Sequence, residues 1–178
     1  MPLHRLLSEQ DISVVVEQET GVRLEAKAVA PEATPEITDS QRKLDILVAE
    51  DNKTNRFVVK KILQSQNVLL RFSHDGQEDV SAYKERVPDL ILMDVSMPIM
   101  DGLAATKAIR DVESTLGISR CPIIALTANA MSGDRENCLA AGMDDYLSKP
   151  LNRKALLNKL AKWGEQVPQG LRNVASIV

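Results

Sequence analysis

Several side chains that could bind a metal ion or transfer a group follow short apolar runs of the sequence. They are acidic, hydroxyl or ammonium groups at the ends of four such runs: Glu50, Asp51, Asp94, Thr127 and Lys149. Crowded carboxylates repel one another unless a cation lies among them, and an all-oxygen ligand set favours a hard ion such as Mg²⁺. A carboxylate, a metal ion, an ammonium and a hydroxyl together suit a phosphoryl group. Asp94 is the candidate nucleophile, because carboxylates form aspartyl phosphates.

These residues converge only if the apolar runs are parallel strands. The runs are short, largely aliphatic and separated by helix-length segments: Leu44–Ala49, Val68–Phe72, Leu90–Met93, Ile123–Leu126 and Tyr146–Leu147. Strand and helix alternating five times predict an α/β fold, a doubly wound parallel sheet with helices on both faces. Ligands of such sheets bind at the carboxyl ends of the strands, so the candidate residues are expected at one edge.

The helix-length segments have apolar residues three and four positions apart. The first carries Phe57, Val58, Ile62 and Leu63, and the last runs up to Gly164, a stop signal. The acidic residues also have a plain structural alternative, because Asp51 or Asn52 could simply cap the helix that follows.

Composition excludes several classes of protein. The 178 residues include 22 Lys and Arg against 25 Asp and Glu, a net charge of −3, and 44% are apolar. The mildly acidic total argues against nucleic-acid binding. No apolar run approaches the ~18 residues that span a bilayer, and no secretion signal opens the chain. We therefore expect a cytoplasmic protein without direct membrane contact, in which Cys121 and Cys138 are not a disulfide scaffold and Cys138 packs in the core.

The chain divides into four regions. Residues 1–30 contain two β-prone runs and are expected to form a β-hairpin-like remnant of a neighbouring domain. Residues 31–43 include two prolines and few large apolar side chains, which is typical of a linker. The α/β domain is expected over residues 44–166, and residues 167–178 are expected to form a tail.

Four motifs in residues 44–166 resemble those of a response-regulator receiver domain, most closely the receivers attached to hybrid sensor histidine kinases. In chain order they are Leu47–Arg56 with its acidic pair, Asp94–Gly102, Pro122–Ala130 and Tyr146–Pro150. The resemblance implies a flavodoxin-like sheet of five parallel strands in the order 2-1-3-4-5. It also implies a cis peptide bond before Pro150.

The resemblance implies a role for each matching position. Asp94 would be the phosphoacceptor, and Thr127 and Lys149 would bind the phosphoryl oxygens. Mg²⁺ would be bound by the Asp51 and Asp94 side chains, by the Ser96 backbone carbonyl and, through water, by Glu50, which stands where Asp is more frequent. The remaining positions are Tyr146 as an aromatic switch with Thr127, Ser96 and Asn129 as residues that tune dephosphorylation, and Asp79, a surface residue without a role.

The expected function is therefore an autocatalytic phosphoacceptor in a two-component phosphorelay. Its donor would be a histidine kinase core or a histidine-phosphotransfer protein, and phosphorylation would repack the face formed by the fourth helix and fifth strand. One alternative is a stand-alone regulator that acts by binding a partner. Another is a haloacid-dehalogenase-type phosphohydrolase, which needs a second Asp where Ser96 stands. The sequence leaves open the signal, the phosphoryl lifetime and a homodimer.

Overall fold

The computed structural model describes residues 42–128 and 132–164. The expected hairpin of residues 1–30, nearly all of the linker, Asn129 and the tail of residues 167–178 lie outside the described residues. Ten elements alternate along the chain: β1 Leu44–Ala49, α1 Lys53–Leu63, β2 Val68–Ser73, α2 Gly76–Glu85, β3 Leu90–Asp94, α3 Gly102–Leu116, β4 Ile123–Thr127, α4 Ser132–Ala141, β5 Asp145–Ser148 and α5 Arg153–Gly164.

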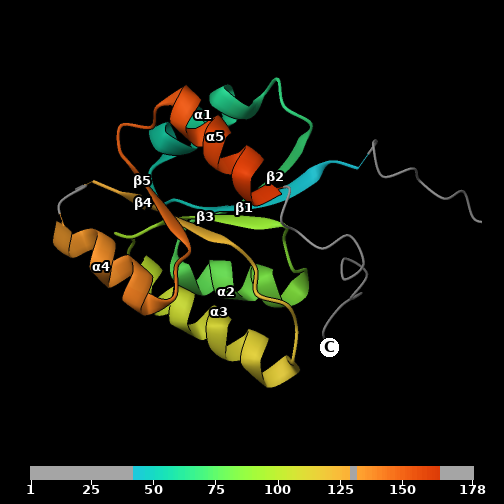
Figure 1. Cartoon of the computed structure of the whole chain (residues 1–178), viewed down its shortest axis with the longest axis vertical. Coiled ribbons are helices and arrows are strands. Elements are labelled where there is room, and N and C mark those ends of the chain that lie inside the picture. Colours follow the sequence, from blue (N-terminus) through green and yellow to red (C-terminus); the bar gives the residue numbers. More distant parts are fainter. Residues whose placement is uncertain (1–41, 129–131, 165–178) are drawn as a thin grey trace, which may run out of the picture. The chain divides into compact units, whose positions relative to one another are not determined.

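The five strands form one sheet in the order β2-β1-β3-β4-β5, and all neighbouring pairs are parallel (Figure 1). The predicted doubly wound fold is confirmed, with its flavodoxin-like strand order. The chain runs outward from β1 to β2 and then returns across β1 to β3. This reversal of direction leaves a crevice at the carboxyl ends of β1 and β3.

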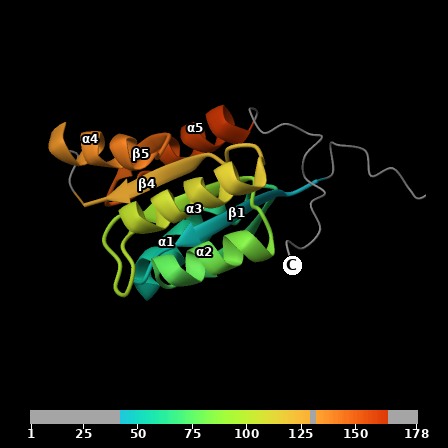
Figure 2. The same cartoon turned by 90° about the horizontal axis from the view of Figure 1, so that it is seen from below.

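Helices cover both faces of the sheet. Figures 1 and 2 show α1 and α5 on one face and α2, α3 and α4 on the other. The apolar stripe of α1 is formed by Val59, Ile62 and Leu63, which pack with Leu156 of α5 against the sheet. The prediction that Phe57 and Val58 belong to this stripe is wrong, because these side chains are 60% and 36% exposed. The stripe begins at Val59, and spacing of three and four from there selects Ile62 and Leu63.

Asp79 lies in α2 and is completely buried, so the expectation of a surface position is wrong. α2 turns this side chain toward β2, where Ser73 Oγ donates a hydrogen bond of 2.8 Å to Asp79 Oδ1. The second carboxylate oxygen, Oδ2, is also buried, and none of the described residues donates a hydrogen bond to it. Burial raises the pKa of Asp79 to about 7, against the opposing effects of the Ser73 hydrogen bond and the charge of Arg71.

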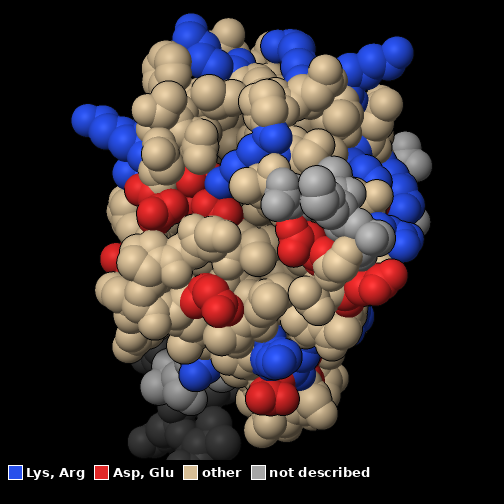
Figure 3. Space-filling model, turned by 90° about the vertical axis from the view of Figure 1, so that its left-hand side faces the viewer, with Lys and Arg blue, Asp and Glu red and all other residues tan. Residues whose placement is uncertain are grey.

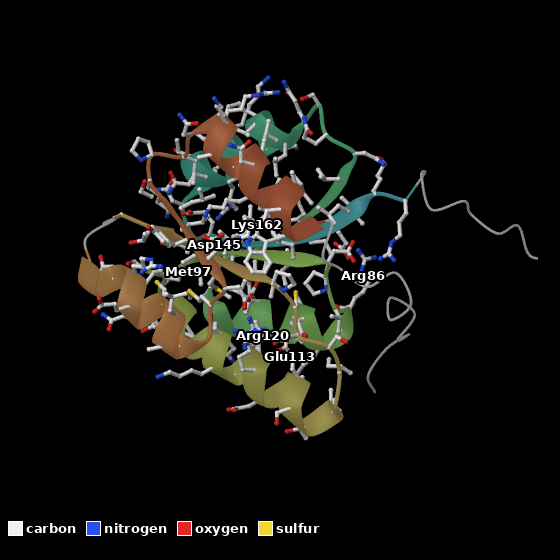
Figure 4. All side chains as sticks on the ribbon, in the orientation of Figure 1. Arg86, Met97, Glu113, Arg120, Asp145 and Lys162 are labelled. Carbon is white, nitrogen blue, oxygen red and sulfur yellow. The ribbon has the colours of Figure 1, made fainter. Side chains whose placement is uncertain are left out.

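A buried polar network lies where β4 and β5 begin, at the end of the sheet opposite the carboxyl ends of the strands. Glu113 of α3, labelled in Figure 4, accepts hydrogen bonds from Tyr83 Oη at 3.0 Å and from the backbone N–H of Cys121 at 2.7 Å. Arg110 Nη1 donates to both Glu113 oxygens, at 2.8 and 2.7 Å, and Arg110 Nη2 reaches Asp144 at 2.7 Å. This network joins α2 and α3 to the segment between α4 and β5.

Both cysteines are buried free thiols, and Cys138 packs in the core as expected. Over residues 42–128 and 132–164, no helix is both long and apolar enough to cross a membrane.

Candidate functional site

Three carboxylates meet where β1 and β3 end, as the sequence predicts. One oxygen from each of Glu50, Asp51 and Asp94 lies within 4.8 Å of the other two. Glu50 and Asp94 are buried, whereas Asp51 is exposed at the mouth of the crevice. Figure 3 looks toward this end of the domain, with acidic side chains across its middle and Lys and Arg gathered above them, over α1 and α5. α1 and α5 together carry eight Lys or Arg and no Asp or Glu.

Lys149 follows β5 and lies against two of these acids. Its Nζ is 2.7 Å from Asp94 Oδ2 and 2.7 Å from Glu50 Oε2. Burial raises the pKa of Asp94, and the charge of Glu50 adds to this while the hydrogen bond from Lys149 opposes it. Burial lowers the pKa of Lys149, but the hydrogen bond to Asp94 and the nearby Glu50 carboxylate outweigh burial and leave that pKa above its usual value. The peptide bond between Lys149 and Pro150 is cis, as the resemblance implied.

The loop between β1 and α1 is held by residues that follow the acidic pair. Asn52 caps α1, since its side chain accepts hydrogen bonds from the backbone N–H groups of Thr54 and Asn55. Of the two predicted alternatives, Asn52 is therefore the cap, and the Asp51 carboxylate does not serve as one. Asn55 Nδ2 donates to Glu50 Oε1 at 2.9 Å.

The loop after Asp94 places that residue by close backbone packing. A Cβ atom added to Gly102, at the start of α3, would lie 2.1 Å from the Asp94 carbonyl oxygen, so only glycine fits. Ile99 has φ +65° and is the central residue of a turn closed by Met100 N–H donating to the Pro98 carbonyl at 2.7 Å. This γ-turn strains a β-branched side chain.

The other predicted residues lie on β4 and β5. Thr127 ends β4 and is buried, and its carbonyl accepts a 2.7 Å hydrogen bond from the backbone N–H of Lys149. Tyr146 is half-buried on β5 between two cations, with Arg135 of α4 at 5.7 Å and Lys159 of α5 at 5.9 Å from its ring centroid. Cations at this distance attract the ring face.

β5 is also fastened to α5 beside Tyr146. Asp145 Oδ1 accepts a 2.6 Å hydrogen bond from Lys159, and Asp145 Oδ2 accepts from Trp163 Nε1 at 3.0 Å and from Lys162 Nζ at 3.4 Å. Asp145 and Lys162 are labelled in Figure 4. Burial alone would raise the pKa of Asp145, but these donors lower it below its usual value.

Two contributors to the site were not predicted. Asn55 binds the Glu50 side chain, and Arg56 Nη1 donates to the backbone carbonyls of Glu50 at 2.8 Å and Asp51 at 2.7 Å. Both residues belong to the first turn of α1. The sequence feature that could have indicated them is a pair of polar side chains at the start of a helix, shortly after two acidic residues.

The donor set fits a hard divalent cation. Its side-chain ligands are oxygens only, and the cluster mixes two buried carboxylates with the exposed Asp51. Mg²⁺ prefers a small number of carboxylates and retains water. The site therefore combines a buried carboxylate that is placed to act as a nucleophile, an ammonium group and residues that could hold a metal ion.

Comparisons with known proteins agree with this arrangement. The family described as "Response regulator receiver domain" matches residues 46–161. Hybrid signal transduction histidine kinase I of Dictyostelium discoideum is 44% identical over 116 residues, which cover 62% of this chain and 7% of that kinase.

Two solved structures are similar to the domain. The receiver domain of sensor histidine kinase PA1611 from Pseudomonas aeruginosa PAO1, which has a magnesium ion coordinated in its active-site cleft, is 45% identical; the match covers 68% of this chain and 97% of that one, with a TM-score of 0.62. The second is a co-crystal structure from Saccharomyces cerevisiae of the histidine phosphotransfer protein Ypd1 with the receiver domain of Ssk1, and its matching chain is 34% identical in sequence. That match covers 72% of this chain and 94% of the other, with a TM-score of 0.67.

The chain belongs to the response-regulator receiver family, the phosphate-accepting modules of two-component phosphorelays. Membership excludes the phosphohydrolase alternative. The chain spans between 4% and 20% of the length of the first curated relatives it matches.

Proposed function

We propose that Asp94 accepts a phosphoryl group from a phosphohistidine. The observation that carries this proposal is the position of Asp94 at the end of β3, with the oxygens of Glu50 and Asp51 within 4.8 Å and the Lys149 ammonium 2.7 Å away. In the transfer, the P–N bond to the imidazole breaks as a carboxylate oxygen of Asp94 bonds to phosphorus, and the imidazole nitrogen regains its electron pair.

The surrounding residues stabilise the charge on the transferred group. Lys149 binds a phosphoryl oxygen, and the Thr127 hydroxyl donates to another. The side chains of Asp51 and Asp94, the Ser96 backbone carbonyl and, through water, Glu50 would hold Mg²⁺, which would supply positive charge beside the phosphoryl oxygens.

The output is a change of packing on the face formed by α4 and β5. A Thr127 hydroxyl drawn toward the phosphoryl group frees space for the Tyr146 ring, which must then leave Arg135 and Lys159. Phosphorylation shifts the population between the two packings. Ser96 and Asn129 tune the lifetime of the phosphoryl group, and decay rates of Ser96→Ala and Asn129→Ala that equal the wild-type rate would contradict this role.

The donor in this proposal is a histidine kinase core or a histidine-phosphotransfer protein, and the chain is part of a hybrid histidine kinase that acts in the cytoplasm. The supports are the hybrid kinases among its relatives and the Ypd1 complex of a similar receiver. A kinase core encoded directly before residue 1 would favour this context over a stand-alone regulator.

The test is phosphorylation by phosphoramidate, whose P–N bond resembles that of phosphohistidine, in the presence of Mg²⁺. Intact mass of the full chain is expected to show one added phosphoryl group, lost in Asp94→Asn and kept in the control Asp111→Asn, an exposed acid on α3. An unmodified wild-type protein, or an Asp94→Asn protein modified to the same extent, would overturn the proposal.

A further inference from the structure

The Glu50 carboxylate is fully buried and depends on a small set of partners. Its Oε1 accepts hydrogen bonds from the Asn52 backbone N–H at 3.1 Å and from Asn55 Nδ2 at 2.9 Å. Its Oε2 faces Lys149 Nζ at 2.7 Å. Among the described residues, Asn55 is thus the one neutral side chain that donates to Glu50. A buried carboxylate without such donors is costly.

The two side-chain partners of Glu50 differ in what else they contact. Lys149 is shared, because its Nζ is also 2.7 Å from Asp94 Oδ2. A phosphoryl group on Asp94 would compete with Glu50 for that ammonium. The position of Asn55 is fixed, since it lies in the first turn of α1 and its backbone N–H donates a 3.3 Å hydrogen bond to the side chain of Asn52, the cap of α1. The Asn55 contact therefore persists when Lys149 turns to another anion.

The first turn of α1 also fixes the backbone that carries the acids. Arg56 Nη1 bridges the carbonyls of Glu50 and Asp51, at 2.8 and 2.7 Å. With the backbone held by Arg56, the remaining freedom of Glu50 is in its side chain. Glutamate has one more rotatable bond than aspartate, so an additional donor is needed to hold its carboxylate at one place.

We infer that Asn55 is a positioning residue for the metal site, which holds the Glu50 carboxylate in the orientation that a hydrated divalent cation needs. The inference rests on the proposed function, because it assigns Asn55 to the cation site of that function. Glu50 and Asn55 then act together, because the hydrogen bond from the Asn55 amide holds in place a side chain that is longer than that of aspartate.

Calorimetric titration of the unphosphorylated full chain with Mg²⁺ tests this positioning role. Removing a group that orients a metal ligand typically weakens metal affinity by roughly 10- to 100-fold, so Asn55→Ala is expected to weaken Mg²⁺ binding about ten-fold. Asn158→Ala, the same change at an exposed position of α5, is expected to leave it unchanged. Asn55→Leu, which keeps the shape and removes the donor, is expected to match Asn55→Ala.

A second pair of proteins distinguishes positioning from a general structural effect. In a Glu50→Asp background the shorter side chain no longer reaches the amide, so adding Asn55→Ala is expected to change Mg²⁺ affinity less than about two-fold. Thermal midpoints in EDTA confirm that each variant is folded. If both Asn55 variants bind Mg²⁺ like the wild type, or if Asn55→Ala costs the same with Asp at position 50, the positioning role is overturned. A wild-type protein that binds no Mg²⁺ overturns the proposed function instead.

Discussion

Replacing Asp79 by alanine is expected to stabilise the protein at neutral pH, although it removes a hydrogen bond. Burial raises the pKa of Asp79 from an ordinary value of about 3.8 to about 7. At about 1.4 kcal/mol per pH unit, this rise corresponds to a penalty of about 4 kcal/mol when the carboxyl is ionised. The hydrogen bond from Ser73 returns about 1 kcal/mol. The expected net gain of Asp79→Ala is about 3 kcal/mol at pH 8.

The free energy of unfolding depends on pH because the folded and unfolded states lose the Asp79 proton at different pH values. Below pH 3.8 the Asp79 carboxyl is protonated in both states, and no ionisation penalty exists. Between about 3.8 and about 7 the unfolded chain releases the proton and the folded protein keeps it, so the free energy of unfolding falls as pH rises. Above about pH 7 the Asp79 carboxyl is ionised in both states, and the free energy of unfolding falls no further.

Urea unfolding followed by Trp163 fluorescence measures this effect at pH 4.5 and pH 8. The free energy gained by Asp79→Ala is expected to be about 3 kcal/mol larger at pH 8 than at pH 4.5. Asp79→Asn, which cannot titrate, is expected to show the same pH trend relative to wild type, whereas Asp111→Ala, at an exposed acid, is expected to show none. The reasoning is refuted if the gain from Asp79→Ala is equal at the two pH values.

Three further substitutions test features of the fold. Ile99→Gly is expected to stabilise the protein by about 1 kcal/mol in urea unfolding, because it relieves a positive φ at an 81% exposed side chain; Ile99→Val, which keeps the strain, should not. Gly102→Ala is expected to lower the thermal midpoint and phosphoramidate labelling together, since its Cβ would meet the Asp94 carbonyl oxygen at 2.1 Å; unchanged values would contradict the packing. Glu113→Ala is expected to cost about 2–4 kcal/mol, because the buried Tyr83 hydroxyl and Cys121 N–H lose their acceptor, while Arg110 keeps Asp144; a loss below about 1 kcal/mol in urea unfolding would show that the network contributes little.

Much of the fold could be predicted because each strand is marked by its residues. Aliphatic runs such as Leu90–Met93 are typical of strands covered on both faces, and these runs coincide with the observed strands to within a residue or two. The convergence of Glu50, Asp51 and Asp94 followed from the same pattern, since parallel strands end at one edge.

What could not be predicted depends on how helices are rotated and how loops are shaped. Asp79 and Phe57 were assigned to the wrong environments because their exposure depends on which stripe of α2 or α1 meets the sheet. Two stripes one position apart satisfy similar spacing in α1, and packing against the sheet selects the one containing Val59. The contact of Asn55 with Glu50 joins side chains five positions apart across a strand-to-helix turn, a geometry that helical spacing does not describe.

The buried network of Glu113 and Arg110 determines where α4 can move. Arg110 Nε donates to the Gly142 carbonyl at 3.0 Å, and its Nη2 donates to Asp144 at 2.7 Å, so the chain just after the carboxyl end of α4 is tied to α3. Nearer the amino end of α4, the Arg135 guanidinium lies 5.7 Å from the centroid of the Tyr146 ring, a contact that is weaker than these hydrogen bonds. A shift that begins near Thr127 would therefore have to break the Arg135–Tyr146 contact at this part of α4, whereas movement of the chain after Ala141 would have to break the Arg110 hydrogen bonds to Gly142 and Asp144.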